Sequence, residues 1–215
     1  CCSILSKQFG RRVWDVVIAY FSTKTLSFLS KNLDIDDDML EVYKYGIEIT
    51  ISSFLNIFLI LVFGLLVGDI ISAIIFLLCI IPLRSYCGGY HASTYLRCNL
   101  IFLLCFLSCH LISELINSAS QEYIKFINEI ILLLSFIPTY IFAPVKNIHK
   151  TLDSKQAVKC RYISFAIQFI YSVAAIILIM LDISYGSTIS ITLSAVAVMI
   201  LIEVFMQRRG YHEAG

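Results

Sequence analysis

The segment ITISSFLNIFLILVFGLLVG, residues 49–68, contains no charged side chain. A helix that crosses the hydrocarbon core of a membrane needs about 20 apolar residues, so this segment has the length of one span. Two later runs, residues 162–181 and 183–202, are equally long and uncharged, and only Asp182 separates them. These three runs predict transmembrane helices.

Three shorter uncharged runs, residues 70–83, 99–113 and 130–145, lie between the long ones. A buried helix of a soluble protein could give a run of this length, but their position between the long runs favours six spans. Composition agrees with this interpretation, because 59% of the residues are hydrophobic and 14% are charged, whereas about a quarter are charged in soluble proteins. We therefore expect an all-α, polytopic membrane protein with about six transmembrane helices.

The region before the first span has a different pattern. Apolar residues from Leu5 to Tyr20 recur at helical spacing, and basic residues occupy the other face. This pattern predicts an amphipathic helix that lies on the inner leaflet or packs on the cytoplasmic face of the protein. No apolar core of a signal peptide follows the early charges. We expect an amphipathic region over residues 1–46, a transmembrane domain over residues 47–205 and a tail over residues 206–215.

The basic residues predict the orientation. With six spans and a cytoplasmic N-terminus, 15 of the 16 Lys and Arg residues fall on the cytoplasmic side and only Lys125 falls outside. Cytoplasmic loops carry an excess of Lys and Arg, and the reverse orientation would contradict this rule. Both termini and the loop at residues 84–98 are therefore expected in the cytoplasm. Membrane lipids are expected partners, and nucleic acid is not.

The loop RSYCGGYHASTYLRC, residues 84–98, is a polar island between two apolar runs. Lipid tolerates unpaired polar groups poorly, so the island is expected in water or in a protein-lined cavity at the membrane edge. It contains His91 and two thiols, Cys87 and Cys98. Histidine and cysteine together are the minimal parts of a thiol nucleophile and its base. The loop is the best candidate for a catalytic site.

The residues alone leave the chemistry of this loop open. In a straight helix the Cα atoms of His91 and Cys98 would be about 10.5 Å apart, too far for a base to reach its nucleophile. A catalytic pair therefore requires a bend, which Gly88 and Gly89 would permit. Alternatively, His91 caps a loop and Cys98 merely begins the next span. Zinc binding by Cys87, His91 and Cys98 is a weaker alternative, because their spacing fits no common structural zinc pattern.

The pattern Arg84-x-Tyr86-x-Gly88-Gly89-x-His91-Ala92-x5-Cys98 closely resembles the signature of the AgrB (accessory gene regulator B) family. These proteins are bacterial membrane endopeptidases of peptide quorum-sensing systems. The amphipathic start, the short spans and an Ala143-Pro144 pair followed by a basic loop extend the resemblance over most of the chain. The resemblance implies a location in the bacterial cell membrane.

The resemblance also implies roles for individual residues. His91 and Cys98 match the catalytic pair, and Arg84 and Gly89 match residues expected to matter for activity. Backbone N–H groups near Gly88 and Gly89 could stabilise the oxyanion of the implied reaction. The implied reaction cleaves a propeptide at its C-terminal side, leaves a thioester on Cys98 and promotes closure of a thiolactone or lactone ring. No metal or organic cofactor is implied. The implied partner is a short amphipathic, AgrD-like propeptide with an acidic C-terminal tail, and a homodimer is compatible with the family.

Residues 146–161 form a basic segment with five basic residues against the single acid Asp153, a formal charge of +4. These charges can enforce topology and contact anionic lipid. A sharper hypothesis is that they attract the acidic tail of the propeptide. The candidate substrate-binding residues are Lys146, Lys150, Lys155 and Lys159.

A second class of function is a small polytopic transporter or peptide exporter without catalysis. Carboxylates inside a membrane often mark transport pathways, and five lie near the expected span ends: Glu48, Asp69, Glu114, Asp182 and Glu203. All five are at the boundaries of apolar runs, where they can reach water. A third interpretation, a membrane scaffold, predicts that a change at Cys98 is harmless.

Overall fold

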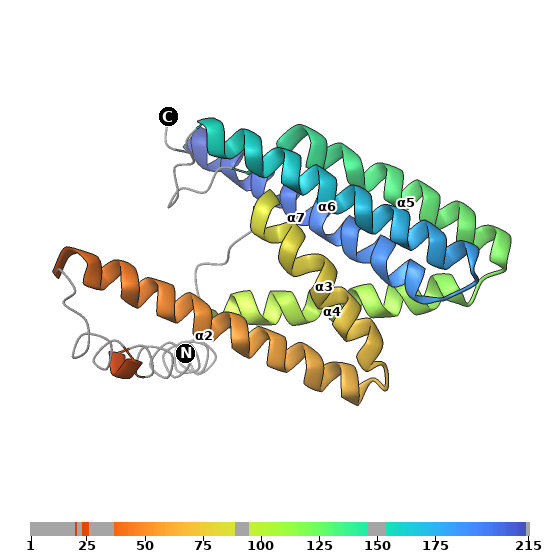
Figure 1. The fold of residues 1–215 in the computed structure, drawn as a ribbon, viewed down its shortest axis with the longest axis horizontal. Coiled ribbons are helices and arrows are strands. Elements are labelled where there is room, and N and C mark those ends of the chain that lie inside the picture. Colours follow the sequence, from red (N-terminus) through yellow and green to blue (C-terminus); the bar gives the residue numbers. More distant parts are fainter. Residues whose placement is uncertain (1–19, 21–22, 26–36, 89–94, 146–153, 214–215) are drawn as a thin grey trace. The chain divides into compact units, whose positions relative to one another are not determined.

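The computed structural model describes residues 20, 23–25, 37–88, 95–145 and 154–213. Every secondary-structure element in these ranges is an α-helix, which confirms the all-α prediction. The helices, shown in Figure 1, are α2 Asp37–Leu66, α3 Ile70–Cys87, α4 Tyr95–Asn117, α5 Gln121–Phe142, α6 Ser154–Met180 and α7 Tyr185–Glu213. The amphipathic helix predicted before the first span lies outside the described residues, apart from Tyr20 and residues 23–25.

Helices α2 to α7 are all long and apolar enough to cross a membrane, so the described residues agree with the prediction of about six spans. The segments that qualify are Gly46–Leu66, Ile70–Cys87, Leu96–Asn117, Gln121–Phe142, Lys155–Met180 and Tyr185–Arg208. The three spans expected to be short reach 18, 22 and 22 residues. They are longer than their uncharged runs because charged residues continue the helices. Glu122 and Glu129, for example, extend α5 at its start and are exposed.

The chain forms two compact units. The first comprises Cys1–Val62 and Ala92–Leu104, and the second comprises Phe63–His91 and Cys105–Gly215. In the first unit, α2 and the start of α4 are joined by a buried hydrogen bond, in which Ser52 Oγ donates to Asn99 Oδ1 at 3.1 Å. Unsatisfied polar groups are costly inside a membrane, so this pair specifies how the two helices meet.

In the second unit, α5, α6 and α7 pack against one another, and α3 packs against α6 and α7 (Figure 1). Small and polar side chains fill much of this interior. Gln168 Nε2 on α6 donates to Ser135 Oγ on α5 at 3.0 Å, and Asn128 Nδ2 on α5 donates to Ser187 Oγ on α7 at 3.1 Å. Helices in lipid associate through close packing and interhelical hydrogen bonds because no hydrophobic effect drives them together. The interior of this unit follows that rule.

The turn between α2 and α3 is built around Gly68 and Asp69. Gly68 has a φ of +80°, a conformation that residues with a Cβ rarely adopt. Asp69 then caps α3, because its Oδ1 accepts a hydrogen bond from the backbone N–H of Ser72 at 3.0 Å. A side-chain acceptor at this position satisfies one of the free amide groups of the first helical turn. The Asp69 carboxylate is thereby held at the start of α3.

Candidate functional site

The polar island at residues 84–98 is not one continuous helix. Helix α3 ends at Cys87, and Gly88 adopts a φ of +74°. The Gly88 N–H donates to the carbonyl of Arg84 at 3.0 Å, so it caps α3 and is not available to stabilise an oxyanion. Helix α4 begins only at Tyr95. Helix α3 therefore ends at Gly88, the first residue of the glycine pair at which a catalytic pairing of histidine and cysteine would need the chain to bend.

The close approach of Val145 leaves little room for a side chain at position 88. A Cβ atom at this position would lie 3.1 Å from the carbonyl oxygen of Val145. The Val145 N–H donates to the Cys87 carbonyl at 2.9 Å, and both Ala143 and Val145 are buried. The segment that follows α5 thus docks on the end of α3. Two sequence features far apart in the chain, Gly88 of the motif and the segment that contains the Ala143-Pro144 pair, meet here.

The two candidate thiols differ in burial. Cys87 is fully buried, whereas Cys98 is half-buried in the first turn of α4. A nucleophile must reach its substrate, and buried structural thiols are inert. Burial therefore favours Cys98 over Cys87 as the reactive thiol.

His91 and Gly89 lie outside the described residues, so the pairing of His91 with Cys98 stays a prediction. Asn99, the residue after Cys98, is buried, and its Oδ1 accepts a hydrogen bond from Ser52 Oγ. Its role in the described part of the chain is to hold the start of α4, and with it Cys98, against α2.

The basic segment at residues 146–161 divides into anchored and exposed cations. The Arg161 guanidinium donates to the Tyr140 carbonyl at 2.5 Å and lies over the Tyr140 ring, 5.2 Å from its centroid. It therefore ties the start of α6 to the end of α5. Lys155 and Lys159 are exposed on the first turns of α6, while Lys146 and Lys150 lie outside the described residues.

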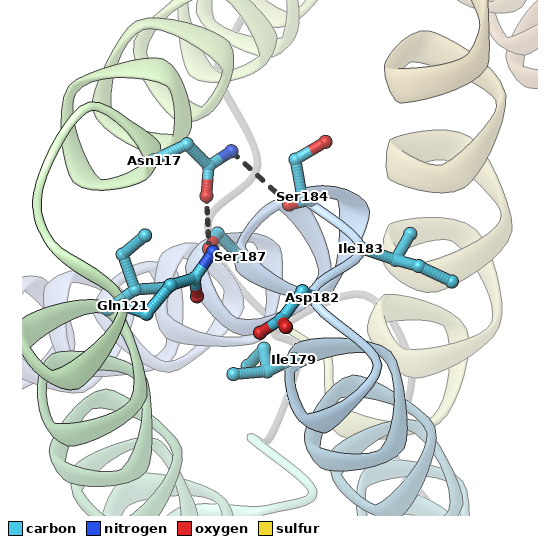
Figure 2. Close-up of a pocket in the computed structure, with 8 residues that line it drawn as sticks. Asn117, Gln121, Ile179, Asp182, Ile183, Ser184 and Ser187 are labelled. Carbon is cyan, nitrogen blue, oxygen red and sulfur yellow. Dashed lines mark hydrogen bonds between the residues drawn. The ribbon is translucent and has the colours of Figure 1, made fainter.

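A small pocket of about 60 Å³ lies between the turn that joins α4 to α5 and the turn that joins α6 to α7 (Figure 2). Asn117 shapes it by donating to the Ser184 carbonyl at 3.2 Å and accepting from Ser187 Oγ at 2.7 Å. A pocket of this volume has room for a few water molecules. It is too small for a peptide substrate.

A second group of titratable side chains, Asp69, His110 and Glu114, was not predicted from the sequence as a site. His110 lies within the apolar run at residues 99–113, which by itself predicts only a span. A histidine four residues before a glutamate on one helix places both side chains on the same face. That spacing was the signal for the pair, but nothing in the sequence links Asp69 to it.

The fold and these residues define a multi-pass helical membrane protein. Residues 22–206 match the family model of accessory gene regulator B, AgrB. The chain belongs to the AgrB family.

Two relatives from Clostridium perfringens match the same share of the chain. A "Putative AgrB-like protein" of strain SM101 is 27% identical over 133 residues, and a "Putative AgrB-like protein 2" of strain 13 is 26% identical over 133 residues. Each match covers 61% of this chain and 62% of the relative. The chain thus spans somewhat less than two thirds of the length of these relatives. No solved structure matches the chain.

Proposed function

We propose that this protein is a membrane cysteine endopeptidase of a quorum-sensing system, in which Cys98 is the nucleophile and His91 is its base. One observation carries the proposal: in a chain of the AgrB family, the thiol of the Arg84-to-Cys98 motif that is not fully buried is Cys98, in the first turn of α4. The end of α3 at Gly88 further supports it, because one continuous helix through residues 84–98 would hold the Cα atoms of His91 and Cys98 about 10.5 Å apart.

The reaction is an acyl transfer. His91 takes the proton from Cys98 Sγ, and the thiolate attacks a backbone carbonyl carbon of the propeptide. The C–N bond breaks, His91 returns the proton to the leaving amine, and the N-terminal part of the peptide remains as a thioester on Cys98. An internal thiol or hydroxyl of the peptide then attacks the thioester, closes the ring and releases Cys98. Exclusion of water at the membrane edge favours ring closure over hydrolysis.

The direct test uses the protein in lipid vesicles and a synthetic propeptide with an amphipathic start, an internal cysteine and an acidic tail. We expect release of the C-terminal fragment, and a protein adduct whose mass equals that of the N-terminal fragment and which maps to Cys98. Hydroxylamine should remove the adduct, as it does any thioester. Passage of intact propeptide across the vesicle wall, with no adduct, would instead support the exporter.

Topology provides an independent prediction, because the proposed site faces the cytoplasm together with both termini. Single cysteines at Ser118 and Ser154, in a background without native thiols, report opposite sides. Ser118 lies in the turn after α4, and Ser154 is the first residue of α6. Impermeant thiol reagent added to intact cells should label the first and spare the second. The reverse labelling would place the Cys98 loop outside and contradict the proposal.

A further prediction concerns capture of the acidic propeptide tail by the basic segment. Replacement of Lys150, Lys155 and Lys159 together by Gln should raise KM more than it lowers kcat, since these cations would act in binding and not in chemistry. The dependence of cleavage on salt should also flatten, because steering between exposed charges weakens at ionic strengths above about 0.1 M.

The matched control for this triple variant is Lys125→Gln, which removes the basic residue expected on the outer side. It should leave KM and the salt dependence unchanged. If the triple variant inserts normally and behaves like the control, the basic segment acts on topology and lipid contact alone.

A further inference from the structure

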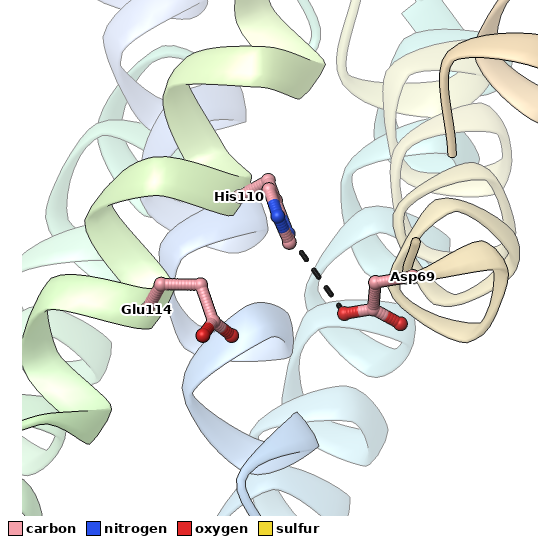
Figure 3. A group of neighbouring side chains, drawn as sticks. All are labelled: Asp69, His110 and Glu114. Atoms are coloured by element: carbon pink, nitrogen blue, oxygen red, sulfur yellow. Dashed lines mark ion pairs between the residues drawn. The ribbon is translucent and has the colours of Figure 1, made fainter. Parts of the chain in front are cut away.

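We propose that Asp69, His110 and Glu114 form a binding site for a divalent transition-metal ion of the Zn²⁺ class. Figure 3 shows the three side chains converging from the start of α3 and from α4. One ligand atom from each residue lies within 4.8 Å of the other two. The site shares no residue with the proposed reaction.

Two helices supply the ligands. His110 and Glu114 are four residues apart on α4, so their side chains are neighbours on one face of that helix. Asp69 approaches from the turn that caps α3, and its Oδ2 lies 3.8 Å from His110 Nδ1. The histidine and aspartate side chains are 13% and 21% exposed, whereas Glu114 is exposed. The site is thus enclosed on the side of two ligands and open on the side of the third.

The nitrogen of His110 is placed as a ligand would be. Its Nδ1 atom is buried and has no hydrogen-bond partner among the described residues. The 3.8 Å to Asp69 Oδ2 is too long for a hydrogen bond. It does suit two atoms bound to one ion, because Zn–N and Zn–O bonds of about 2.0–2.2 Å keep two ligand atoms within about 4.3 Å. A rotation of the exposed Glu114 side chain would bring the third ligand into that range.

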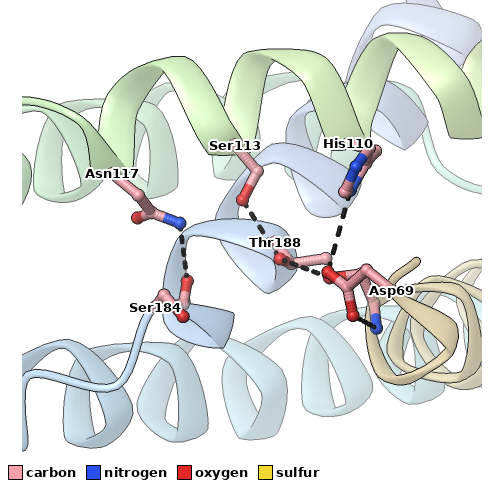
Figure 4. Close-up of polar contacts among 7 residues, drawn as sticks. Asp69, His110, Ser113, Asn117, Ser184 and Thr188 are labelled. Carbon is pink, nitrogen blue, oxygen red and sulfur yellow. Dashed lines mark hydrogen bonds and ion pairs between the residues drawn. The ribbon is translucent and has the colours of Figure 1, made fainter. Parts of the chain in front are cut away.

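Hydrogen bonds hold the aspartate in place (Figure 4). Ser72 Oγ donates to Asp69 Oδ2 at 2.5 Å, and the Ser72 N–H donates to Oδ1. Ser113 Oγ and Thr188 Oγ1 are hydrogen-bonded at 3.1 Å, and Thr188 Oγ1 lies 3.5 Å from Ser72 Oγ. Metal-binding carboxylates usually have such outer partners, which fix their orientation. Each carboxylate oxygen has two lone pairs, so one hydrogen bond still leaves capacity for a metal.

The donor set indicates the class of ion. One imidazole and two carboxylates, with further positions open to water, suit a divalent transition metal. Mg²⁺ and Ca²⁺ prefer oxygen ligands alone. Two carboxylates this close also repel each other, and a divalent cation between them removes that repulsion.

The position of the site suggests a structural role. Asp69 directly precedes α3 and Gly88 directly follows it. A helix of 18 residues is about 27 Å long, so the ion would bind far from the Gly88 end of α3. With the proposed topology it would face the outside of the cell. There it would hold the turn between α2 and α3 against the last turns of α4.

The test measures metal binding to the purified protein after treatment with a chelator. Saturating Zn²⁺, at a hundredfold excess over Kd, should raise the Tm by about 5 °C or more. Co²⁺ should produce visible absorption bands without a thiolate charge-transfer band, because no cysteine is a ligand. His110→Gln and Glu114→Gln should each weaken Zn²⁺ binding by at least about tenfold. The control Glu129→Gln, which removes an exposed carboxylate of α5, should bind like wild type.

Each result of these binding measurements either supports or overturns the proposed metal site. No Zn²⁺-dependent change in the wild-type protein overturns the site. Equal binding by the wild type and both variants also overturns it, since the ion then binds elsewhere, for example at cysteines. An equal Tm rise with Mg²⁺ or Ca²⁺ contradicts the assignment to a transition metal. If His110→Gln does not fold, the exposed Glu114→Gln decides. Cleavage of the propeptide is not the readout, so the metal site and the proposed peptidase can fail independently.

Discussion

Replacement of Cys98 by alanine is expected to abolish cleavage of the propeptide, while the protein still inserts into the membrane. The expected loss is at least about 10³-fold, because removal of the nucleophile from a covalent mechanism leaves only the contribution of substrate binding. Cys98→Ser should be nearly as inactive, since a serine hydroxyl at this position has no comparable acidity. The measurement is the amount of C-terminal fragment released by each variant in vesicles, normalised to the amount of inserted protein.

Two other thiols serve as controls for this experiment. Cys160 is half-buried on α6, and Cys160→Ser should retain wild-type cleavage. Cys87→Ala removes the competing thiol of the same loop, which is fully buried, and should keep most of the activity. Cleavage by the Cys98→Ala protein would refute the assignment. Loss of cleavage in Cys87→Ala alone, with normal insertion, would transfer the role of nucleophile to Cys87.

Replacement of Gly186 by alanine markedly destabilises the protein. Gly186 lies in the first turn of α7, and a Cβ atom there would lie 2.5 Å from Ile179 Cγ1, 2.8 Å from the Ala175 carbonyl oxygen and 3.0 Å from the Ile179 backbone nitrogen. Two of these three atoms belong to the backbone of α6, so the clash is relieved only if the two helices separate. Overpacking of this kind costs about 1–3 kcal/mol, and a valine should cost more.

The measurement for this prediction is the Tm of the purified variant in detergent, together with the fraction that elutes as a single species. Gly46→Ala is the matched control, because nothing lies within 4 Å of a Cβ at that position of α2. Alanine is the better helix former by about 1 kcal/mol, so the control should be neutral or slightly more stable than wild type. A Gly186→Ala protein with an unchanged Tm would show that α6 and α7 can move apart at little cost.

The sequence by itself determined the fold class and the number of spans. The thickness of the hydrocarbon core sets how many apolar residues a helix needs, and that requirement is local to each segment. The predicted ends of the helices were less accurate, because charged residues such as Glu122 continue a helix beyond its apolar run. The sequence also indicated the loop at residues 84–98 as a candidate site, since polar residues between two spans must lie in water or in a protein-lined cavity.

The tertiary structure decided what depends on contacts between distant segments. Cys87 is fully buried and Cys98 is half-buried, although both thiols belong to the same motif. Val145 docks on the end of α3 and leaves little room for a side chain at position 88, which explains the glycine there. Asp69 and His110 meet only because α3 and α4 converge, and no periodicity in one segment encodes the neighbours that another segment supplies. Local patterns therefore predict elements and motifs, whereas burial and long-range pairing arise only when the helices pack.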